Sequence, residues 1–286
     1  MTRGHEVVRT RGGAMAIRSL AEGEVMHPGV GPLVEAEELY VRQSRLAARL
    51  EAREHAPEND GTLVLFDIGL GAGSNALAAW ATSERAAPGA ARLLIISFER
   101  DLGALELAVE LALGPAPALA SEFGMEGERL TAARGLLATG HHETARTSWC
   151  LARGDIIDSL QAESAKADVI YWDPFSPRAN PESWTVAAFA AARRVAGTRC
   201  TLFTYSAATS VRVALLLAGW TVGAGAAIGE KLATTAAAVD VRALGAPLDA
   251  RWLARLARSG APLPADAPGD ARSIVATLPQ FTRVVP

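Results

Sequence analysis

A glycine-rich segment between an apolar run and a helical stretch is the first part of the chain that could do chemistry. The run Thr62–Phe66 is typical of a buried strand. The residues that follow it and could serve a ligand are Asp67, Gly69, Gly71, Gly73 and Asn75. Glycines at a strand exit let a ligand approach the backbone and the N–H groups of the next helix. The spacing G-x-G-x-G differs from the dinucleotide fingerprint G-x-G-x-x-G, and the preceding carboxylate suits a cationic or amine-bearing ligand better than a pyrophosphate.

Two further acidic residues follow strand-like runs. Glu99 ends the second run, at the place where nucleoside-binding α/β folds accept both ribose hydroxyls. Asp155 follows the third run, after Gly154. Its carboxylate could accept a hydrogen bond from an exocyclic amine such as that of adenine, or it could cap the helix that begins at Ile156. One side chain could do both.

A proline-bracketed loop follows the fourth strand-like run. Asp173 is followed by Pro174, Phe175, Ser176 and Pro177, and the two prolines prevent the strand from continuing. The loop therefore lies at the carboxyl end of a strand, the edge where open α/β sheets hold ligands. A carboxylate beside an aromatic ring suits an amine substrate, because the acid accepts an N–H and the ring stacks on a base. A plain turn with a half-buried Phe is the alternative.

In chain order, these features are typical of class I methyltransferases that depend on S-adenosylmethionine. Adenine, ribose and the methionine amine of that cofactor each need an acceptor, and Asp155, Glu99 and Asp67 supply one each. Its sulfonium cation also favours an acidic pocket.

The elements that must position these residues alternate along the chain. Strand candidates cover residues 62–66, 93–96, 146–152, 168–172 and 199–205. Helix candidates cover residues 74–85, 101–112, 127–138, 156–164, 182–196 and 207–218. This alternation predicts an α/β protein with the Rossmann-like class I methyltransferase fold, a mostly parallel seven-stranded sheet with helices on both faces.

The ends of the chain differ from this central part. Residues 5–20 suit a hairpin around Gly12 and Gly13, and apolar positions from Val34 to about Arg53 suit an amphipathic helix. We therefore expect an N-terminal hairpin and helix extension over 1–58, a cofactor-binding domain over 59–245 and a C-terminal extension over 246–286.

Composition excludes several classes of protein. Half of the 286 residues are hydrophobic and the formal net charge is −3, so neither disorder nor a broadly basic surface is indicated. Cys150 and Cys200 stand far apart in apolar stretches and indicate neither a disulfide framework nor a metal site. No secretory signal or membrane-spanning run is evident, so we expect a cytoplasmic protein without a membrane partner.

The segment that begins at Asp173 carries a sharper resemblance. Asp173-Pro-Phe-Ser-Pro, followed by Asn180-Pro-Glu-Ser-Trp184-Thr, resembles a signature of the methyltransferase half of the bacterial bifunctional tRNA wobble-uridine enzyme and its stand-alone relatives. His27 through Glu35, the glycine turn, Glu99 and the segment from Phe203 agree with the same family. The resemblance runs from about residue 5 to residue 245.

The resemblance implies an activity and a set of site residues. The activity is methylation of the aminomethyl nitrogen of a modified wobble uridine in tRNA, with Asp173 as the catalytic or substrate-orienting residue. Cofactor contacts are implied for Glu35, Asp67, Gly69, Gly71, Gly73, Asn75, Glu99 and Asp155. Substrate contacts are implied for Phe175, Pro177, Asn180, Trp184 and Lys231. No metal is implied, and the FAD-dependent oxidase half of the family has no counterpart here, so we expect the methylating step alone.

One departure and two alternatives accompany this hypothesis. After Lys231 the family has a basic-acidic-Met stretch, whereas Leu232-Ala-Thr-Thr follows here, so the sequence departs from the family pattern at that strand. An aminopropyltransferase like spermidine synthase shares the glycine turn but would need extra acids for a polyamine near Asp173. A fold that binds a nucleoside or a partner protein without catalysis is the other alternative, and the intact acids argue against it.

Arginines on the first helix are a candidate contact for RNA phosphates. Arg42, Arg45 and Arg49 would share one helix face by their spacing of three and four. A solvated face paired with Glu37, Glu38 and Glu51 explains the same residues.

Overall fold

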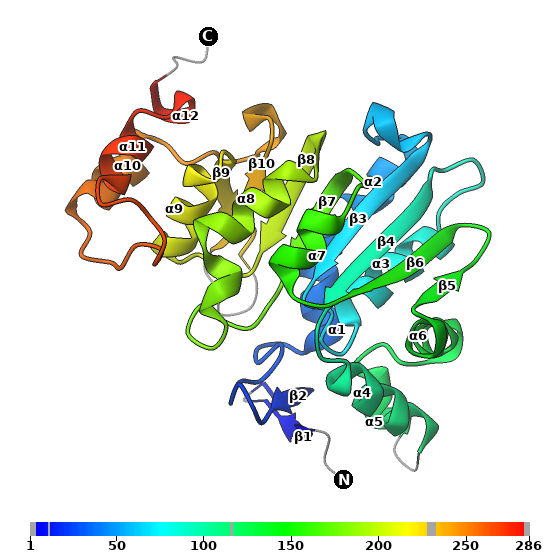
Figure 1. Ribbon diagram of the computed structural model, residues 1–286. Helices are drawn as coiled ribbons and strands as arrows, with labels where there is room; N and C mark the ends of the chain where they lie inside the picture. The colour runs from blue at the N-terminus through cyan, green and yellow to red at the C-terminus, as the bar shows by residue number, and fades with distance from the viewer. Residues whose placement is uncertain (1–3, 11, 115–116, 228–232, 283–286) are drawn as a thin grey trace.

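The fold is built on one large mixed sheet. The structure is a computed structural model that describes residues 4–10, 12–114, 117–227 and 233–282. Eight strands pair in the order β5-β6-β4-β3-β7-β8-β10-β9 (Figure 1). The five parallel strands are β3 (Thr62–Ile68), β4 (Arg92–Glu99), β6 (Thr147–Arg153), β7 (Ala167–Trp172) and β8 (Ala196–Thr204). The predicted Rossmann-like, mostly parallel sheet is confirmed.

Three further strands pair antiparallel with their neighbours in the sheet. Strand β10 (Thr234–Ala238) lies antiparallel between β8 and β9 (Thr221–Gly225). Strand β5 (His141–Glu143) pairs antiparallel with β6 and makes the described sheet eight-stranded where seven strands were predicted. It was missed because three polar residues carry no apolar alternation. Gly140, with φ 73°, ends the preceding helix and turns the chain back onto β6.

Helices cover both faces of the sheet, as predicted. On one face lie α3 (Ser74–Glu84), α4 (Gly103–Leu113) and α6 (Gly127–Thr139), and on the other lie α7 (Ile156–Ala162), α8 (Val186–Arg194) and α9 (Thr209–Leu217). Strand β3 shows why. Leu63 and Leu65 pack in the hydrophobic cluster on the side of α3, α4 and α6, whereas Val64, Phe66 and Ile68 pack in the cluster on the side of α7, α8 and α9. Successive side chains of a strand point to opposite faces, so a strand buried on both faces is apolar throughout.

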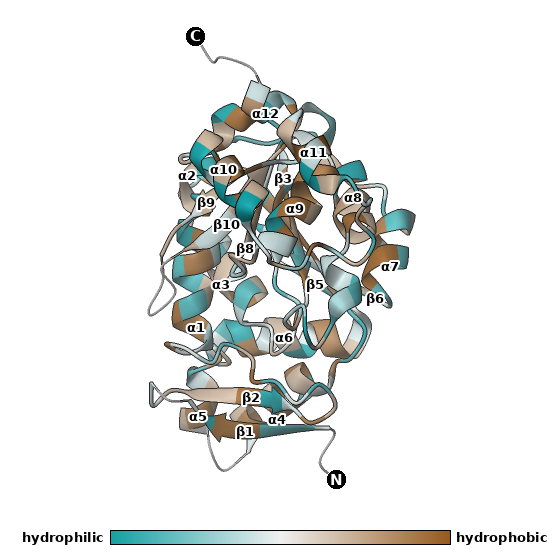
Figure 2. Ribbon diagram, turned by 90° about the vertical axis from the view of Figure 1, so that its left-hand side faces the viewer, coloured by the Kyte–Doolittle hydropathy of each residue, from teal (hydrophilic) through white to brown (hydrophobic). Residues whose placement is uncertain are grey.

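The N-terminal hairpin is confirmed, and it lies beside the ligand-binding edge of the sheet. Strands β1 (His5–Arg9) and β2 (Met15–Ser19) pair antiparallel. They lie next to α4 and the short α5 (Pro117–Ser121), below the carboxyl ends of the parallel strands (Figure 2).

The single helix predicted from Val34 to Arg53 is wrong. The segment forms α1 (Pro32–Glu35), a π-helical stretch η1 (Ala36–Arg42) and α2 (Leu46–Glu51), with Arg45 left-handed at φ 55° between the last two. The break rotates Arg49 inward, where it is 8% exposed and donates to the Thr201 hydroxyl over 3.1 Å. Arg42 pairs with Glu38 at 2.8 Å. The proposed three-arginine face is therefore not formed.

The C-terminal segment packs at the far end of the molecule from the hairpin. Helices α10 (Ala250–Arg258), α11 (Ala271–Ala276) and α12 (Pro279–Thr282) lie beside α9 and β9 (Figure 1). The Trp252 and Phe281 rings stack with centroids 6.0 Å apart. The Gln280 amide bonds both backbone groups of Val222 and so covers the edge of β9.

Short 3₁₀ turns complete the described chain at η2 (Pro57–Asn59), η3 (Pro181–Trp184) and η4 (Val241–Ala243). Among the helices of the described residues, none combines the length and apolar character that a membrane crossing requires.

Candidate active site

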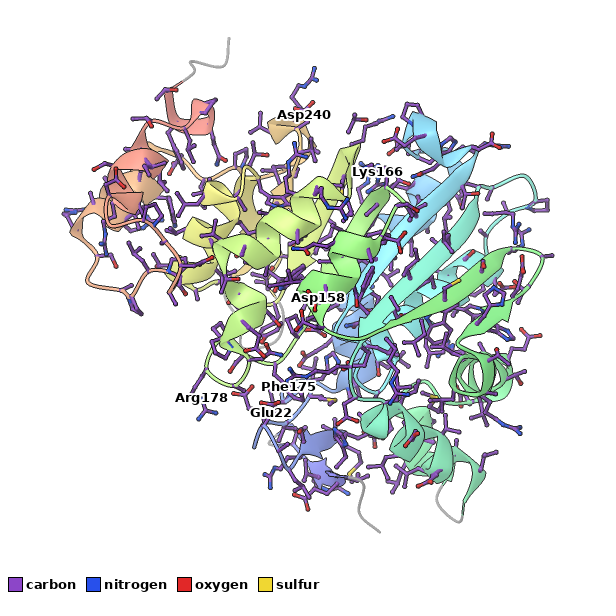
Figure 3. The ribbon with its side chains drawn as sticks, in the orientation of Figure 1. Glu22, Asp158, Lys166, Phe175, Arg178 and Asp240 are labelled. Carbon is purple, nitrogen blue, oxygen red and sulfur yellow. The ribbon has the colours of Figure 1, made fainter. Side chains whose placement is uncertain are left out.

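A cavity of about 540 Å³ lies at the carboxyl edge of the parallel strands. Its volume is within the range of small-molecule sites. Its walls come from the loop after β2, the glycine turn, the ends of β4 and β6, and the loop after β7. Figure 3 shows Glu22, Phe175 and Arg178 gathered at this edge, while Lys166 and Asp240 lie at the opposite edge. The order of the strands reverses between β3 and β7, so the cavity lies at the switch point where such sheets bind ligands.

The glycine turn and the Asp173 loop touch each other at this point. The backbone N–H of Asp173 donates to the carbonyl of Ile68 over 2.9 Å. Gly69 has φ 84°, and a Cβ there would lie 2.8 Å from the carbonyl oxygen of Asp173. Gly69 and Gly71 line the cavity. Gly73 precedes α3 with φ 88° and is not on the cavity wall. A Cβ at Gly73 would point toward Leu105. The first glycine is therefore required by a close approach of two loops.

Glu99 is held on the cavity wall by backbone N–H groups. Its Oε2 accepts from Gly71 at 3.1 Å, and its Oε1 accepts from Arg100 at 2.8 Å and Asp101 at 3.0 Å. Burial raises the pKa of the Glu99 carboxyl, and these three hydrogen bonds oppose the shift. The carboxylate is thus fixed in place beside the glycine turn.

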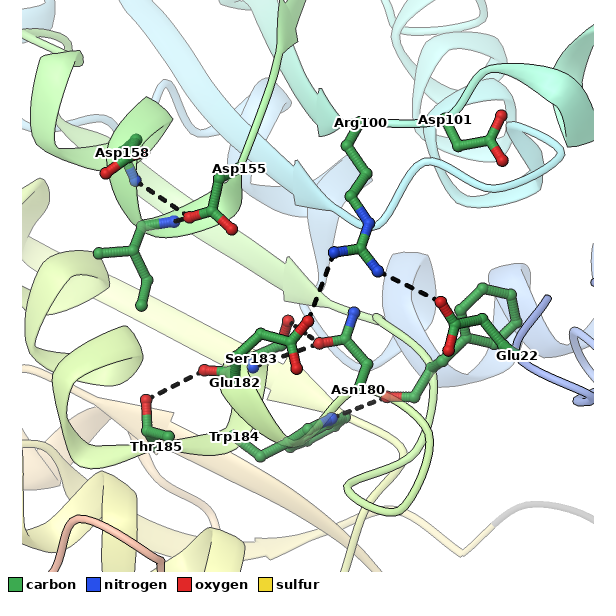
Figure 4. Close-up of polar contacts among 12 residues, drawn as sticks. Glu22, Arg100, Asp101, Asp155, Asp158, Asn180, Glu182, Ser183, Trp184 and Thr185 are labelled. Atoms are coloured by element: carbon green, nitrogen blue, oxygen red, sulfur yellow. Dashed lines mark hydrogen bonds and ion pairs between the residues drawn. The ribbon is translucent and has the colours of Figure 1, made fainter.

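Asp155 caps helix α7 and also lines the cavity. Its Oδ1 accepts from the backbone N–H groups of Ile157 at 2.8 Å and Asp158 at 3.3 Å (Figure 4). The capping interpretation is therefore confirmed. Because both capping bonds use Oδ1, the same carboxylate can also serve a ligand in the cavity.

Asp173 is the carboxylate at the centre of the site. It lines the cavity at the end of β7, with 11% of its side chain exposed. Its Oδ2 accepts from the Asn75 side-chain amide at 2.7 Å and lies 3.7 Å from Nε2 of His27. Burial raises the pKa of the Asp173 carboxyl, while His27, Tyr40 and Asn75 oppose the shift. Asn75 is not on the cavity wall, so its place in the structure is behind Asp173.

Asp67 is placed away from the cavity. It is fully buried, and it accepts a hydrogen bond from the Ser97 hydroxyl at 2.8 Å, which in turn accepts from the Trp149 indole at 2.9 Å. Asp67 is the last residue but one of β3, so its side chain points into the core beneath the helices rather than out of the sheet edge. Burial raises its pKa to about 7. Asp67 is therefore not among the described residues that line the cavity.

We expect Asp67→Asn to change how stability depends on pH. The carboxyl has a pKa of about 7 in the folded chain and about 3.9 when unfolded. Between these values the folded state holds a proton that the unfolded state releases, so stability falls as pH rises from about 4 to 7 and then levels off. From pH 5 to pH 8, wild type should lose up to about 3 kcal/mol more unfolding free energy than the variant, measured by urea titration. Equal losses in both proteins would contradict this.

The loop after β7 divides the predicted substrate residues into two groups. Phe175 and Asn180 line the cavity, although the Asn180 side chain also accepts from the Ser183 hydroxyl at 2.6 Å. Trp184 is buried, and its indole N–H donates to the carbonyl of Phe175 at 2.7 Å (Figure 4). Pro177 is not on the cavity wall, so it and Trp184 shape the loop. Lys231 lies outside the described residues.

The loop between β2 and α1 closes one side of the cavity. Arg100 pairs with Glu22 at 3.2 Å and with Glu182 at 3.4 Å (Figure 4). Glu24 accepts from the backbone N–H of Ser176 at 3.0 Å and pairs with exposed Arg178 at 3.0 Å. Burial of Glu24 acts to raise its pKa, but the bonds from Ser176 and Arg178 outweigh this and hold the pKa low.

Sequence reasoning did not assign these loop contacts. Glu22, Glu24 and Arg100 belong to no motif, and their partners are about 80 to 150 positions away in the chain. The sequence places His27 only at the start of a segment, His27 through Glu35, that agrees with the family. Glu35 was assigned to the site, and the structure places it on the cavity wall, with Oε1 accepting from the Gly29 N–H at 3.0 Å.

Comparisons with known proteins agree with this geometry. Residues 130–240 match the family described as S-adenosyl-L-methionine-dependent methyltransferase. The bifunctional protein MnmC, named for tRNA 5-methylaminomethyl-2-thiouridine biosynthesis, is 32% identical over 83% of this chain in Methylibium petroleiphilum. The same protein of Pseudomonas aeruginosa is 33% identical over 71% of this chain. The chain is an S-adenosylmethionine-dependent methyltransferase and resembles the methyltransferase half of MnmC.

The chain spans about a third of the length of the curated relatives that it matches. The matched region spans 35% of the Methylibium protein and 30% of the Pseudomonas protein. A solved structure, MNMC2 from Aquifex aeolicus, superposes with a TM-score of 0.68 at 23% identity and covers 95% of this chain and 83% of that one. At that identity the structural likeness supports the fold of the methyltransferase.

Proposed function

We propose that this methyltransferase transfers a methyl group from S-adenosylmethionine to the aminomethyl nitrogen of a modified wobble uridine in tRNA, giving 5-methylaminomethyl-2-thiouridine. The observation that carries the proposal is the place of Asp173, a carboxylate on the cavity wall that adjoins the glycine turn and is held by Asn75. An amine substrate needs an acceptor there, and the curated relatives are named for biosynthesis of the same nucleoside. The proposal covers methyl transfer alone and includes no flavin step.

The cavity wall offers open backbone and negative charge that suit the cofactor. Gly69 and Gly71 bring bare backbone to the wall, and the acids on that wall suit a ligand with a sulfonium cation. In this proposal Glu99 accepts from the ribose hydroxyls, Asp155 from the adenine amine, and Glu35 closes the pocket. When bound, S-adenosylmethionine supplies a methyl group on a positively charged sulfur.

Asp173 and Phe175 are proposed to handle the substrate. A neutral amine is the reactive form, so the site must orient the aminomethyl group and remove its proton. Asp173 can accept that proton, because its carboxylate faces the cavity. The Phe175 ring lies on the same wall and offers a surface on which the uracil ring can stack.

We expect Glu99→Gln to weaken cofactor binding. The amide keeps one acceptor and would turn its NH₂ group toward backbone N–H groups that now donate to Glu99. Losing hydrogen bonds to a charged group should raise the Kd for S-adenosylhomocysteine about 10- to 100-fold by titration calorimetry. Glu128→Gln, on the exposed first turn of α6, is the matched control. A Kd within twofold of wild type would refute the assigned contact.

The decisive experiment is methyl transfer from labelled S-adenosylmethionine to tRNA purified from a strain that lacks the modification. The proposal requires label in the wobble nucleoside, identified after digestion. Decarboxylated S-adenosylmethionine with putrescine, the substrates of an aminopropyltransferase, should give no product. Cofactor binding without any methyl transfer would instead favour a non-catalytic binding protein.

A further inference from the structure

His27 lies between two carboxylates in the cavity. Its Nδ1 is 3.5 Å from Oε2 of Glu35, and its Nε2 is 3.7 Å from Oδ2 of Asp173. The ring is largely buried, with 13% of the side chain exposed. Each nitrogen therefore faces a different acid, and both neighbours favour the doubly protonated, positively charged ring.

The backbone holds His27 in an uncommon conformation. Its φ is +51°, in the left-handed region that non-glycine residues seldom adopt, and it directly precedes Pro28. The loop is tied down two residues later, where the Gly29 N–H donates to Oε1 of Glu35 over 3.0 Å. Such conformations cost free energy and cluster at functional sites. The fold thus maintains a strained loop that places this ring against Asp173.

We propose that His27 is a positioning residue whose positive charge keeps Asp173 ionised and turned into the cavity, ready to take a proton from the substrate's ammonium group. This inference rests on the proposed function. In the step it serves, a proton leaves the ammonium nitrogen and binds an oxygen of Asp173. The nitrogen keeps the electron pair, so the amine becomes neutral and nucleophilic.

Electrostatics gives the direction of the effect. Among the influences on Asp173, burial raises its pKa most and His27 is the largest that lowers it. An opposite charge within about 4 to 6 Å lowers the pKa of an acid by roughly 1 to 3 units. Without His27, Asp173 would hold its proton at higher pH and could not accept another.

Other titratable groups act on this pair or on its neighbours. Glu35, Tyr40, Asp67 and Tyr205 interact electrostatically with Asp173, while Glu24 acts on Tyr205 and Glu99 acts on Asp67. Burial raises the pKa of both tyrosines well above its ordinary value, which keeps them neutral. Asp67, with a pKa of about 7, is the group whose titration must be told apart from that of Asp173.

The test follows the Asp173 carboxyl carbon by NMR during a pH titration of wild type, His27→Gln and His27→Lys, with Asp173→Asn and Asp67→Asn to identify the two resonances. We expect the Asp173 midpoint to rise by about one pH unit or more in His27→Gln and to return toward wild type in His27→Lys, which restores a positive charge. An unchanged midpoint in His27→Gln overturns the proposal. His141→Gln, on the exposed strand β5, is the matched control.

Two further readouts complete the test. The acid limb of kcat/KM for methyl transfer should move to higher pH in His27→Gln by the same amount, about tenfold in rate per unit below the limb. If His27→Gln does not fold, the ¹⁵N spectrum of wild-type His27 decides: a neutral ring at pH 7 overturns the proposal, and a doubly protonated ring supports it. If wild type methylates no tRNA, the proposed function fails, and the carboxyl titration still tests whether His27 controls Asp173.

Discussion

Asp173→Asn is expected to lower kcat for methyl transfer about 100- to 10,000-fold, the usual effect of removing a positioned general base. The amide has the same shape and can still accept from Asn75 through its oxygen, so the loop after β7 should keep its place. It cannot take a proton from an ammonium group, and the substrate amine would stay charged and unreactive. The substitution therefore removes the negative charge of residue 173 and keeps the shape of its side chain.

The measurement is single-turnover methyl transfer to unmodified tRNA at several pH values. Binding of S-adenosylhomocysteine should change less than threefold, because the proposed cofactor contacts are elsewhere on the wall. Asp158→Asn removes a carboxylate from α7, off the cavity wall, and serves as the control. A kcat for Asp173→Asn within threefold of wild type would refute the assignment of Asp173.

Gly69→Ala is expected to lower the free energy of unfolding by about 3 to 5 kcal/mol, through overpacking and backbone strain together. A Cβ at this position would lie 2.8 Å from the carbonyl oxygen of Asp173 and 2.9 Å from the nitrogen of Pro174. Both are backbone atoms and cannot turn aside. The loop that carries Asp173 would have to move, so methyl transfer should fall together with stability.

Gly89→Ala separates the two causes. Gly89 has φ +88°, close to the +84° of Gly69, but a Cβ there would meet no atom within 4 Å. It therefore carries the strain of a left-handed alanine without the collision, about 1 to 2 kcal/mol. Urea unfolding of both variants at one pH measures the difference. Equal losses would show that the close approach of the two loops contributes nothing.

The central sheet could be predicted from the chain because its strands are buried on both faces. The runs that contain Phe66, Ile96 and Ile170 are continuous and apolar, and an acid follows each of them within three positions. The ends of the strands were therefore located, and with them Glu99, Asp155 and Asp173. The short β5 and the broken helix after Pro32 were not located, because neither follows a regular apolar period.

The side-chain directions at the strand ends could not be predicted. Asp67 and Asp173 both come late in or just after a strand, yet only Asp173 reaches the cavity. A shift of one residue along a strand turns a side chain to the other face, so small differences in strand length decide between core and cavity. Asn75 was assigned to the cofactor for a similar reason, and the first turn of α3 aims it at Asp173 instead.

The order of strands, turns and acids along the chain is encoded in the sequence, and that order indicates the class of cofactor and the edge of the sheet that holds it. These follow from local patterns, since burial periodicity and turn residues are encoded within a few positions. The groups that surround Asp173, in contrast, are set by tertiary packing. His27 and Glu35 reach it from a loop and a helix about 140 positions earlier in the chain. Such contacts depend on how the N-terminal loop packs across the sheet, and no local pattern encodes that packing.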